Sequence, residues 1–596
     1  MGLPGVYMTV LDGNLNLQAG SSEDTLLWLG CSLNGTANTL GSYGNPATMK
    51  SQLMGGRLLE AASYSLDVSG GIVYVMPMNP SVRGGVSSVT HGGAGAGTMT
   101  VAIGSHAAIT ITCTTAGALG TAAFTFAVTD PISGVTSTTS PILSAASWSS
   151  TGFRIPGTYV NWVATAGSYI AGGSADTYAI PTNGGVITHP TGAGPAVGTY
   201  TASPVDDYTP RIAITTGGAN GTMQFTYCLD YNASAALNVT STATSSAIVS
   251  AGGGVYAIPG TGLVLTFSGT QTAGDTFDFS AAGPTFGASD RAAALTALQT
   301  TYLAQMGNIG MIVVDGETVS AASWATQVSA LETSATALFN LGVFVNFFSS
   351  TPTVGTVLGN AGSVTVDAAD TDAVVIAQRV TMSAKDVCPC AGDDLMPGVV
   401  SGLNFRRPSM WGTAARAASV EASQDIGATE NGGLVGVVGL FRDENATPAF
   451  YAAGITCHRT YAPAAATGFY ATMGLMATTS NSDYYSLTNS RVVDRACTIA
   501  YGAAFPYTLA KIPTTTRNGQ SGLITEKKAQ KIEGRIRGAL ATALVDTSPQ
   551  NAVAVNATVD RSHNILSDGK VPITVSVQPF AYGKEIDVTV GMTTQA

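Results

Sequence analysis

An internal repeat places the strongest constraint on how this chain can fold. Short blocks recur in the same order at offsets of 99 to 104 residues, within a Thr/Ser/Gly/Ala-rich stretch from about 95 to 285. The matched blocks are residues 120–126 and 221–227, 135–138 and 239–242, 155–158 and 258–261, and 176–178 and 275–277. Such a period indicates duplicated structural units. Frequent turn signals between short alternating runs favour β-sandwiches, so we predict two tandem all-β, sandwich-like domains.

The sequence on either side of this stretch has a mixed helix and strand pattern. Apolar runs at 26–29, 71–76, 310–314 and 343–348 are typical of buried strands, and 374–380 is a further candidate. Helices are predicted at 49–63, 291–304 and 321–338. A strand–helix–strand order with short links implies a parallel sheet. We therefore predict an α/β (α+β) body into which the two β-domains are inserted, with the Gly-rich run at 91–97 as a joint.

The clearest helix is predicted at 526–545, after Thr525 as a candidate cap. One apolar stripe runs along it, and Lys527, Lys531 and Arg535 lie off that stripe. The basic face has two interpretations: a solvated face paired with Glu526 and Glu533, or a docking face for an acidic partner. Alternating strands are predicted at 571–577 and 586–590.

Composition excludes several classes of protein. Charged residues make up 10% of the 596 residues and the net charge is -11, which argues against direct nucleic-acid binding. No apolar run reaches the roughly 18 residues of a membrane span, so no membrane insertion is expected. The N-terminus lacks the features of a secretion signal. Seven scattered cysteines do not form a disulfide-dense scaffold.

Motifs for chemistry are weak. The run from Gly92 to Gly97 lacks the Lys-Ser/Thr of a phosphate loop and favours a linker. Cys388-Pro389-Cys390, followed by Asp393 and Asp394, leaves three possibilities open: structural thiols, a disulfide within an assembly, or a metal site.

The five histidines, His91, His106, His189, His458 and His563, do not lie in any known catalytic motif. Cys457 and His458 are adjacent in sequence, which is not the usual arrangement of a catalytic pair. We therefore expect no enzymatic activity, no catalytic or metal-binding residues and no cofactor.

The C-terminal third resembles the contractile phage tail sheath family, which includes sheaths of related contractile injection systems. The residues that carry the resemblance are Gly436-Val437-Val438-Gly439 through Tyr451, Gly454 and Arg459-Thr460, then Leu487 through Arg491, Asp494 and Ala496, then the helix 526–545 and the terminal strands. The spacing before Arg459-Thr460 is longer than in the family pattern. Tandem β-repeats are not a required part of such proteins.

The resemblance implies a structural subunit that polymerises as rings stacked in a helix around a tail tube and contracts. It implies an N-terminal arm (1–20), a sheath body (21–92 plus 286–480), inserted β-domains (93–198 and 199–285), a tube-facing C-terminal domain (481–580) and a C-terminal arm (581–596). Expected partners are further copies, the tail tube protein, and baseplate and tail terminator proteins. The expected location is the virion tail, assembled in the bacterial host cytoplasm.

The resemblance also implies that both chain ends add strands to neighbouring copies. The arm residues would be Val6, Tyr7, Met8, Thr9, Val10, Ile586, Asp587, Val588, Thr589 and Val590. The receiving sheet would contain Ile573, Thr574, Val575, Ser576 and Val577, and Lys527, Lys531 and Arg535 would face the tube. Residues 13–20 and Tyr582-Gly583 would be hinges.

Two alternatives remain open at the level of the sequence. One is another virion structural protein, such as a capsid or decoration protein. The other is a surface-layer protein or adhesin with Ig-like repeats.

Overall fold

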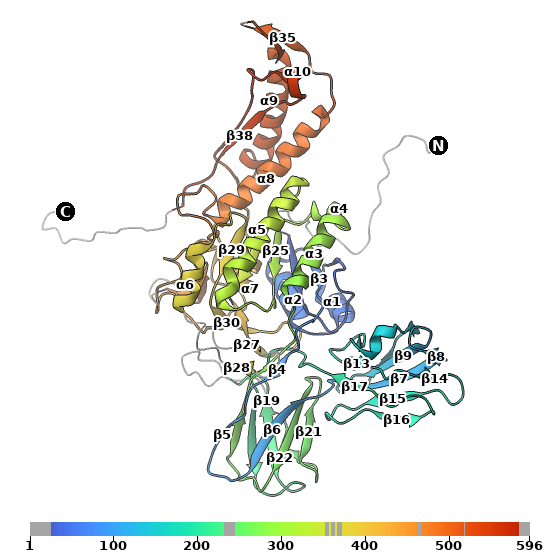
Figure 1. The fold of residues 1–596 in the computed structure, drawn as a ribbon. Helices are drawn as coiled ribbons and strands as arrows, with labels where there is room; N and C mark the ends of the chain where they lie inside the picture. The colour runs from blue at the N-terminus through green and yellow to red at the C-terminus, as the bar shows by residue number, and fades with distance from the viewer. Residues whose placement is uncertain are drawn as a thin grey trace, which may run out of the picture.

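The computed structural model describes residues 25–231, 245–351, 357–358, 364–365, 372–461, 467–517 and 519–582. An α/β body lies at the centre of the molecule (Figure 1). Two groups of β-strands lie at one end of the body, and a projection built on two long helices lies at the other. The predicted arms at 6–10 and 586–590 fall outside the described residues.

The body is built on one six-stranded sheet. Its order is β2-β3-β1-β25-β26-β29, and all neighbours except β2 and β3 pair in parallel. The strands are β1 (Leu26–Gly30), β2 (Gly41–Tyr43), β3 (Val73–Pro77), β25 (Met311–Val314), β26 (Asn346–Ser350) and β29 (Val387–Cys390). Parallel sheets are covered on both faces, which explains the continuous apolar runs.

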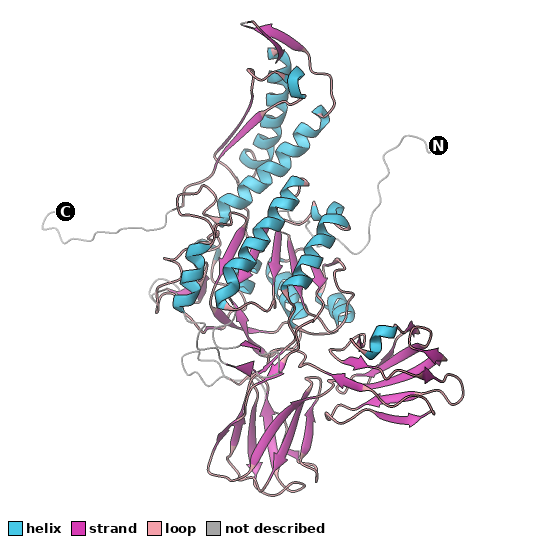
Figure 2. Ribbon diagram, viewed as in Figure 1, coloured by secondary structure: helices cyan, strands magenta, loops and turns pink. Residues whose placement is uncertain are grey.

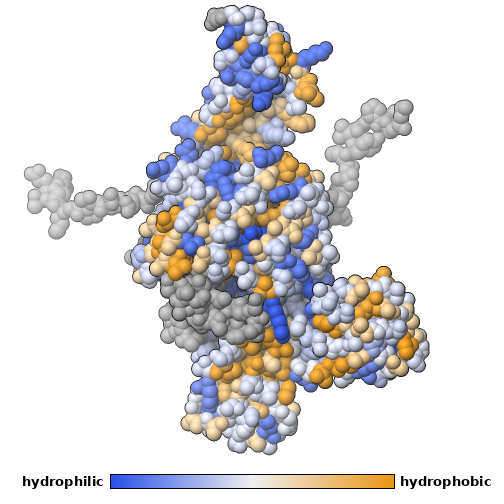
Figure 3. Space-filling model, in the orientation of Figure 1, coloured by the Kyte–Doolittle hydropathy of each residue, from blue (hydrophilic) through white to orange (hydrophobic). Residues whose placement is uncertain are grey.

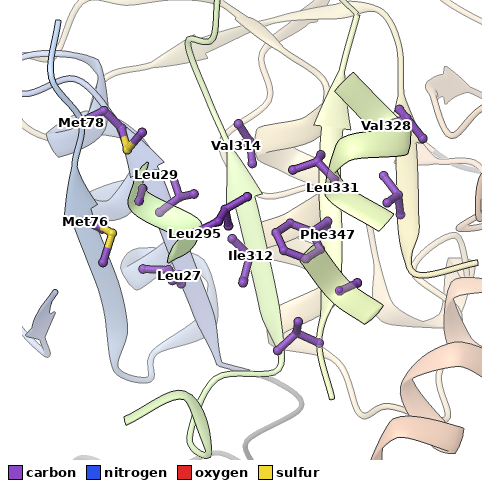
Figure 4. Packing of buried hydrophobic residues seen from close by; sticks show 14 of the residues in the cluster. Leu27, Leu29, Met76, Met78, Leu295, Ile312, Val314, Val328, Leu331 and Phe347 are labelled. Carbon is purple, nitrogen blue, oxygen red and sulfur yellow. The ribbon is translucent and has the colours of Figure 1, made fainter. Parts of the chain in front are cut away.

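Two apolar cores cover the two faces of this sheet. Leu27, Ile312 and Phe347 point to one side, where they meet Leu295 and Leu331 from helices (Figure 4). Trp28, Val313 and Phe348 belong to the core on the other side. Side chains alternate along each strand, so every second residue enters the same core. The predicted parallel sheet is confirmed.

The body helices differ from the predictions in two places. The predicted helix 49–63 is two helices, α1 (Pro46–Leu53) and α2 (Arg57–Ser69), because Gly56 adopts a φ of 95° between them. The predicted strand 374–380 is wrong. That segment forms α6 (Asp372–Thr381), whose Val375 and Arg379 are buried four residues apart, at helical spacing. The run Val387–Cys390 provides the edge strand instead.

The other body helices are α3 (Ala288–Thr300), α4 (Leu303–Met306), α5 (Trp324–Asn340) and α7 (Met410–Ser419). Short antiparallel pairs complete the body. They are formed by β30 (Asp393–Pro397), β31 (Asn404–Pro408), β32 (Gly439–Leu440), β33 (His458–Thr460), β34 (Phe469–Ala471), β27 (Val357–Leu358) and β28 (Val364–Thr365). Figure 2 shows helices concentrated in the body and projection, and strands in the two β-groups. Among the described residues, no helix is both long and apolar enough to cross a bilayer.

The first β-group, β-unit A, covers residues 105–202. Its strands are β7 (Ala108–Thr115), β8 (Gly117–Ala118), β9 (Ala123–Thr129), β10 (Thr136–Thr138), β11 (Ile142–Leu143), β12 (Phe153–Arg154), β13 (Asn161–Val163), β14 (Ser168–Tyr169), β15 (Thr177–Ile180), β16 (Thr188–Thr191) and β17 (Thr199–Thr201). They enclose an aromatic core that includes Phe124, Phe126, Trp162 and Tyr178.

The second β-group, β-unit B, combines residues 90–103 with residues 204–282. Its strands are β5 (Thr90–Gly92), β6 (Thr98–Ile103), β18 (Arg211–Thr216), β19 (Gln224–Cys228), β20 (Ile248–Val249), β21 (Val255–Ile258), β22 (Leu263–Ser268) and β23 (Thr276–Asp278). This grouping differs from the predicted boundaries at 93–198 and 199–285, because β6 pairs with β22 and β5 with β23. Residues 90–103 are therefore strands of unit B and not a joint.

β-unit B is attached to the body through β4 (Gly85–Val86), which pairs with β24 (Ala281–Ala282), and through buried ion pairs. Arg407, with a fully buried side chain, donates to both oxygens of Asp206 at 2.8 Å and to Asp207 at 3.0 Å. Arg57 joins Asp207 to Asp315 at the end of β25. Burial raises the pKa of Asp206 to about 6. Charges buried at this depth need such partners, so the network fixes unit B against the sheet.

Candidate functional site: an open sheet edge and a basic helix

The projection is formed by two helices and two small sheets (Figure 1). Helix α8 (Leu487–Ala504) packs along α9 (Glu526–Leu540), which continues into a π-helical turn (Ala541–Val545). The sheets are β35 (Thr514–Arg517) with β36 (Gln520–Ile524), and β37 (Ala554–Val559) with β38 (Ile573–Gln578); α10 (Ile565–Asp568) lies in the last connection. The predicted helix 526–545 and the strand at 571–577 are confirmed.

Strand β38 has one paired edge and one open edge among the described residues. It pairs with β37 over six residues, and no described strand pairs with its other side. Asp560 donates its backbone N–H to the carbonyl of Pro572 at 2.9 Å, which marks 560 and 572 as a hydrogen-bonded pair. Hydrogen-bonded pairs alternate along an antiparallel ladder. The main-chain groups of Ile573, Val575 and Val577 therefore point away from β37, toward the open edge.

An apolar groove of about 1100 Å³ lies beside this edge. The same three side chains of β38 line one wall, and they are only partly buried against α8 and α9. Helix α8 provides Val492, Ala496 and Ala500, and the end of α5 provides Phe339 and Leu341, each 47% exposed. Exposed apolar surface of this kind marks an interaction site. The open edge offers hydrogen bonds and the groove beside it offers apolar contact.

The basic side chains of α9 form a second feature. Ala529, Ile532, Ile536 and Leu540 are buried, whereas Lys527, Lys531 and Arg535 are exposed at spacings of four residues. Residues four apart lie on one face of a helix, so these three side chains form a basic ridge. Arg535 also lies over the ring of Tyr507, 5.8 Å from its centroid.

The acidic residues of α9 do not neutralise this ridge. Glu526 and Glu533 both bind Arg561, at 2.8 Å and 2.7 Å. Hydrogen bonds from Arg561 lower the pKa of Glu526 to about 2 and also lower the pKa of Glu533. No described acidic group forms an ion pair with Lys527, Lys531 or Arg535. Thr525 lies at the predicted cap position, but its side chain makes no capping hydrogen bond.

Figure 3 shows hydrophilic surface next to hydrophobic patches on the projection. The structure therefore brings the predicted receiving strand and the predicted tube-facing residues into one projecting region. Sequence reasoning did not find the groove or Arg561. The alternating apolar face of 571–577 was the one available signal for the groove, because its partner surface on α8 is about 80 residues earlier.

The predicted hinge residue Tyr582 is fixed rather than free. Its hydroxyl donates to the carbonyl of Ser423 at 2.6 Å. The other hinge residues, 13–20 and Gly583, are outside the described part of the chain.

The cysteine motif and the glycine-rich run, which were weighed as chemical sites, both have structural roles in the fold. Cys388 and Cys390 are buried in β29, and burial raises the pKa of Cys390. All seven cysteines are free thiols, and no group of described residues could hold a metal ion. The run Gly92–Gly97 wraps the carboxylate of Asp275, which accepts from the amide of Gly95. The amide of Gly95 is therefore not directed at a phosphate.

One cluster has the geometry of a nucleophile triad. His458 contacts Asp394 at 2.7 Å through Nδ1 and Thr413 Oγ1 at 3.0 Å through Nε2. All three residues are at most 2% exposed. Catalysis needs access for a substrate, and this cluster is enclosed by the body. It satisfies polar groups inside the core, as buried polar groups require.

No protein-family model matches this chain, and no curated protein matches it. Among solved structures, the sheath tail protein from Desulfitobacterium hafniense is 10% identical, with a TM-score of 0.37 over 97% of this chain and 100% of that one. The sheath tail protein from Listeria innocua is also 10% identical, with a TM-score of 0.38 over 95% and 96%. The sheath of an extracellular contractile injection system, in its contracted state, is 13% identical with a TM-score of 0.33, covering 50% and 75%. These likenesses are distant. By structure, the chain is similar to sheath tail proteins and to components of contractile injection systems.

Proposed function

We propose that this chain is the structural subunit of a contractile tail sheath, which polymerises as a helix around a tail tube and contracts. The observation that supports it most directly is an edge of β38 that pairs with no described strand and lies beside an apolar groove. Unpaired edges promote aggregation in a protein that acts alone. In a subunit that assembles, the same edge is a joint between copies.

The proposed occupant of the edge is a terminal arm of another copy. Residues 586–590 alternate, with Ile586, Val588 and Val590 on one face, and residues 6–10 place Val6, Met8 and Val10 in the same way. A strand added to β38 would receive hydrogen bonds from the main chain and place this apolar face in the groove. A contact between two different surfaces that does not close into a ring generates a helix.

Main-chain hydrogen bonds explain how such subunits can move without separating. They hold an added strand regardless of its side chains, so other faces can repack during contraction. We propose that the energy for contraction comes from packing between subunits.

The basic ridge of Lys527, Lys531 and Arg535 is the proposed tube contact. These cations lack described acidic partners, and an acidic tube surface would supply them. The β-units lie at the opposite end of the body (Figure 1), so they would face outward as inserted all-β domains. Baseplate and tail terminator proteins are the proposed partners at the two ends of the sheath, in a virion tail assembled in the host cytoplasm.

The test is negative-stain microscopy of purified full-length protein. Long hollow cylinders are expected from the wild type. A variant lacking residues 1–15 should remain a folded monomer, as judged by circular dichroism and sedimentation, and should form no cylinders. Cylinders from that variant, or a structure in which both chain ends pair within their own copy, would contradict the proposal. Closed shells or flat lattices would instead favour a capsid or surface-layer protein.

A further inference from the structure

The two β-units have the same strand layout. In unit A the sheets run β10-β9-β7-β15-β16, with β11 also paired to β9, and β12-β13-β17; in unit B they run β20-β19-β18-β23-β5 and β21-β22-β6. Strand β20 corresponds to β11, because Ile248 pairs with Phe225 as Ile142 pairs with Phe124. Strand β9 therefore corresponds to β19, and β15 to β23, as the sequence repeat requires. The same comparison matches β16 to β5 and β17 to β6. We call β16–β17 and β5–β6 the closing pairs, because each completes both sheets of its unit.

Individual contacts repeat as well. The amide of Gly120 donates to Ser144 Oγ at 3.1 Å, and the amide of Gly221 donates to Ser250 Oγ at 3.0 Å. Thr158 and Thr261 donate from their hydroxyls to the carbonyls three residues earlier, at 2.8 Å and 2.9 Å. These equivalences extend the repeat from sequence to side-chain geometry.

The closing pairs share an unusual polar centre. In unit A, buried Asp176 accepts from the amide of Gly194 at 2.8 Å and contacts His189 Nε2 at 3.3 Å, and His189 stacks on Tyr178. In unit B, buried Asp275 accepts from Gly95 at 3.1 Å and contacts His91 Nε2 at 3.6 Å, and His91 stacks on Phe277.

The glycines of the closing pairs are required by this centre. A Cβ on Gly194 would lie 1.8 Å from Asp176 Oδ2, and a Cβ on Gly95 would lie 2.0 Å from Asp275 Oδ2. Two buried carboxylates thus fix two Gly-rich runs in the same way. The Gly-rich composition of 91–97, which suggested a joint, is the mark of a closing pair.

Unit A is continuous in the chain, with its closing pair directly after its remaining strands, whereas the closing pair of unit B lies on the far side of unit A. The closing pair 90–103 comes directly before the remaining strands of unit A, yet it completes unit B. The closing pair 188–201 comes directly before the remaining strands of unit B, yet it completes unit A. In sequence, each repeat consists of a closing pair followed by the remaining strands. The first repeat covers residues 90–187 and the second covers residues 188–282.

We infer that the two β-units are repeats that have exchanged their closing pairs within one chain, and that residues 90–103 act as a clasp that closes unit B across unit A. The connections on both sides of unit A lie close together, because both bond to residues 261–262 of unit B. Gly104 donates to the carbonyl of Gly262 at 3.0 Å, and Val205 donates to that of Thr261 at 3.0 Å. Unit A is therefore joined to unit B through two chain connections, one after β6 and one before β18. This inference does not depend on the sheath proposal.

Cysteine pairs in the full-length chain distinguish the exchanged arrangement from the sequential one. Thr100 lies opposite Thr266 across β6 and β22. In a sequential arrangement Thr100 would take the place of Thr199, which lies opposite Val163. Under mild oxidation, T100C/T266C should form an intrachain disulfide in most molecules, detected by peptide mass mapping, and T100C/V163C should form almost none. The reverse result would overturn the exchange, and disulfide-linked dimers of T100C/T266C would show exchange between copies instead.

Two glycine variants test the clasp without new cysteines. Gly95→Val should open unit B and leave unit A closed, so limited proteolysis should cut within 90–103 and 245–282 at least tenfold faster than in the wild type. Gly194→Val should open unit A and leave unit B closed. Equal opening of both units by Gly95→Val, or no opening of unit B, would overturn the assignment of 90–103 as the clasp of unit B.

Discussion

The central sheet of the body and the β37–β38 sheet of the projection use similar residues in opposite ways. Val313 in β25 is flanked by paired strands on both sides and is 0% exposed. Val577 in β38 has a strand on one side, and it is only partly buried. The first sheet is complete within one copy. Among the described residues the second is incomplete in hydrogen bonds and in apolar cover, as the proposed assembly requires.

This difference separates stability from assembly. Burial in the body stabilises the monomer, since apolar burial contributes about 25 cal/mol per Å². Further burial at β38 requires cover by a segment other than the described residues, which we propose is an arm of another copy. Variants in the two sheets should therefore affect different measurements.

The largest expected effect is on monomer stability, and it uses the same substitution in each sheet. Val313→Ala should lower the free energy of unfolding by about 2 kcal/mol, because it leaves a cavity in a packed core. Val577→Ala should lower it by less than about 1 kcal/mol, because the side chain is already partly exposed. Urea unfolding followed by fluorescence measures both. Equal losses would mean that β38 is covered within its own copy.

A proline at the open edge should affect assembly more than stability. Val575→Pro removes an N–H that points away from β37, so the β37–β38 ladder keeps its bonds. Loss of a main-chain bond worth about 1 kcal/mol to an added strand should raise the critical concentration for cylinder formation roughly fivefold. The control is Ser576→Pro, which removes a donor to β37 and should destabilise the monomer. An unchanged critical concentration for Val575→Pro would exclude β38 as the receiving strand.

Charge reversal on α9 tests whether the projection also binds a tube. Lys531→Glu with Arg535→Glu should weaken assembly on tubes severalfold at low salt, and less at high salt, because exposed charges are screened. Lys50→Glu, on exposed α1, is the matched control and should have no effect. Unimpaired assembly of the double variant on tubes would show that the ridge faces elsewhere.

The smallest expected effect concerns the ion pairs of Arg561. The folded-state pKa of Glu526, about 2, lies below its ordinary value of 4.5. The folded state thus releases this proton more easily than the unfolded chain, and stability from this group is present above pH 4.5 and lost as the pH falls toward 2. Arg561→Gln should make the loss of stability between pH 4.5 and pH 2 smaller. Thermal melts of both proteins from pH 5 to 2.5 check it, and identical profiles would contradict the assigned pairing.

Local patterns in the sequence determined a large part of this molecule. The apolar runs at 26–29 and 310–314 predicted buried strands, and the stripe from Ala529 to Leu544 predicted α9, because burial on one face imposes a period that neighbouring residues display. The same reasoning placed the basic ridge and the strand at 571–577. It failed at 374–380, where a short apolar run fits a strand or a helix equally well.

Only the tertiary structure decided which distant segments meet. No local pattern shows that residues 90–103 complete unit B, that Arg561 forms ion pairs with both glutamates of α9, or that α8 forms the second wall of the groove. Each of these contacts joins residues that are 28 to about 190 positions apart. The energy of such a contact depends on the shape and charge of a partner that cannot be identified from the local sequence. Periodicity reports which face of a segment is buried, whereas the fold selects what that face is buried against.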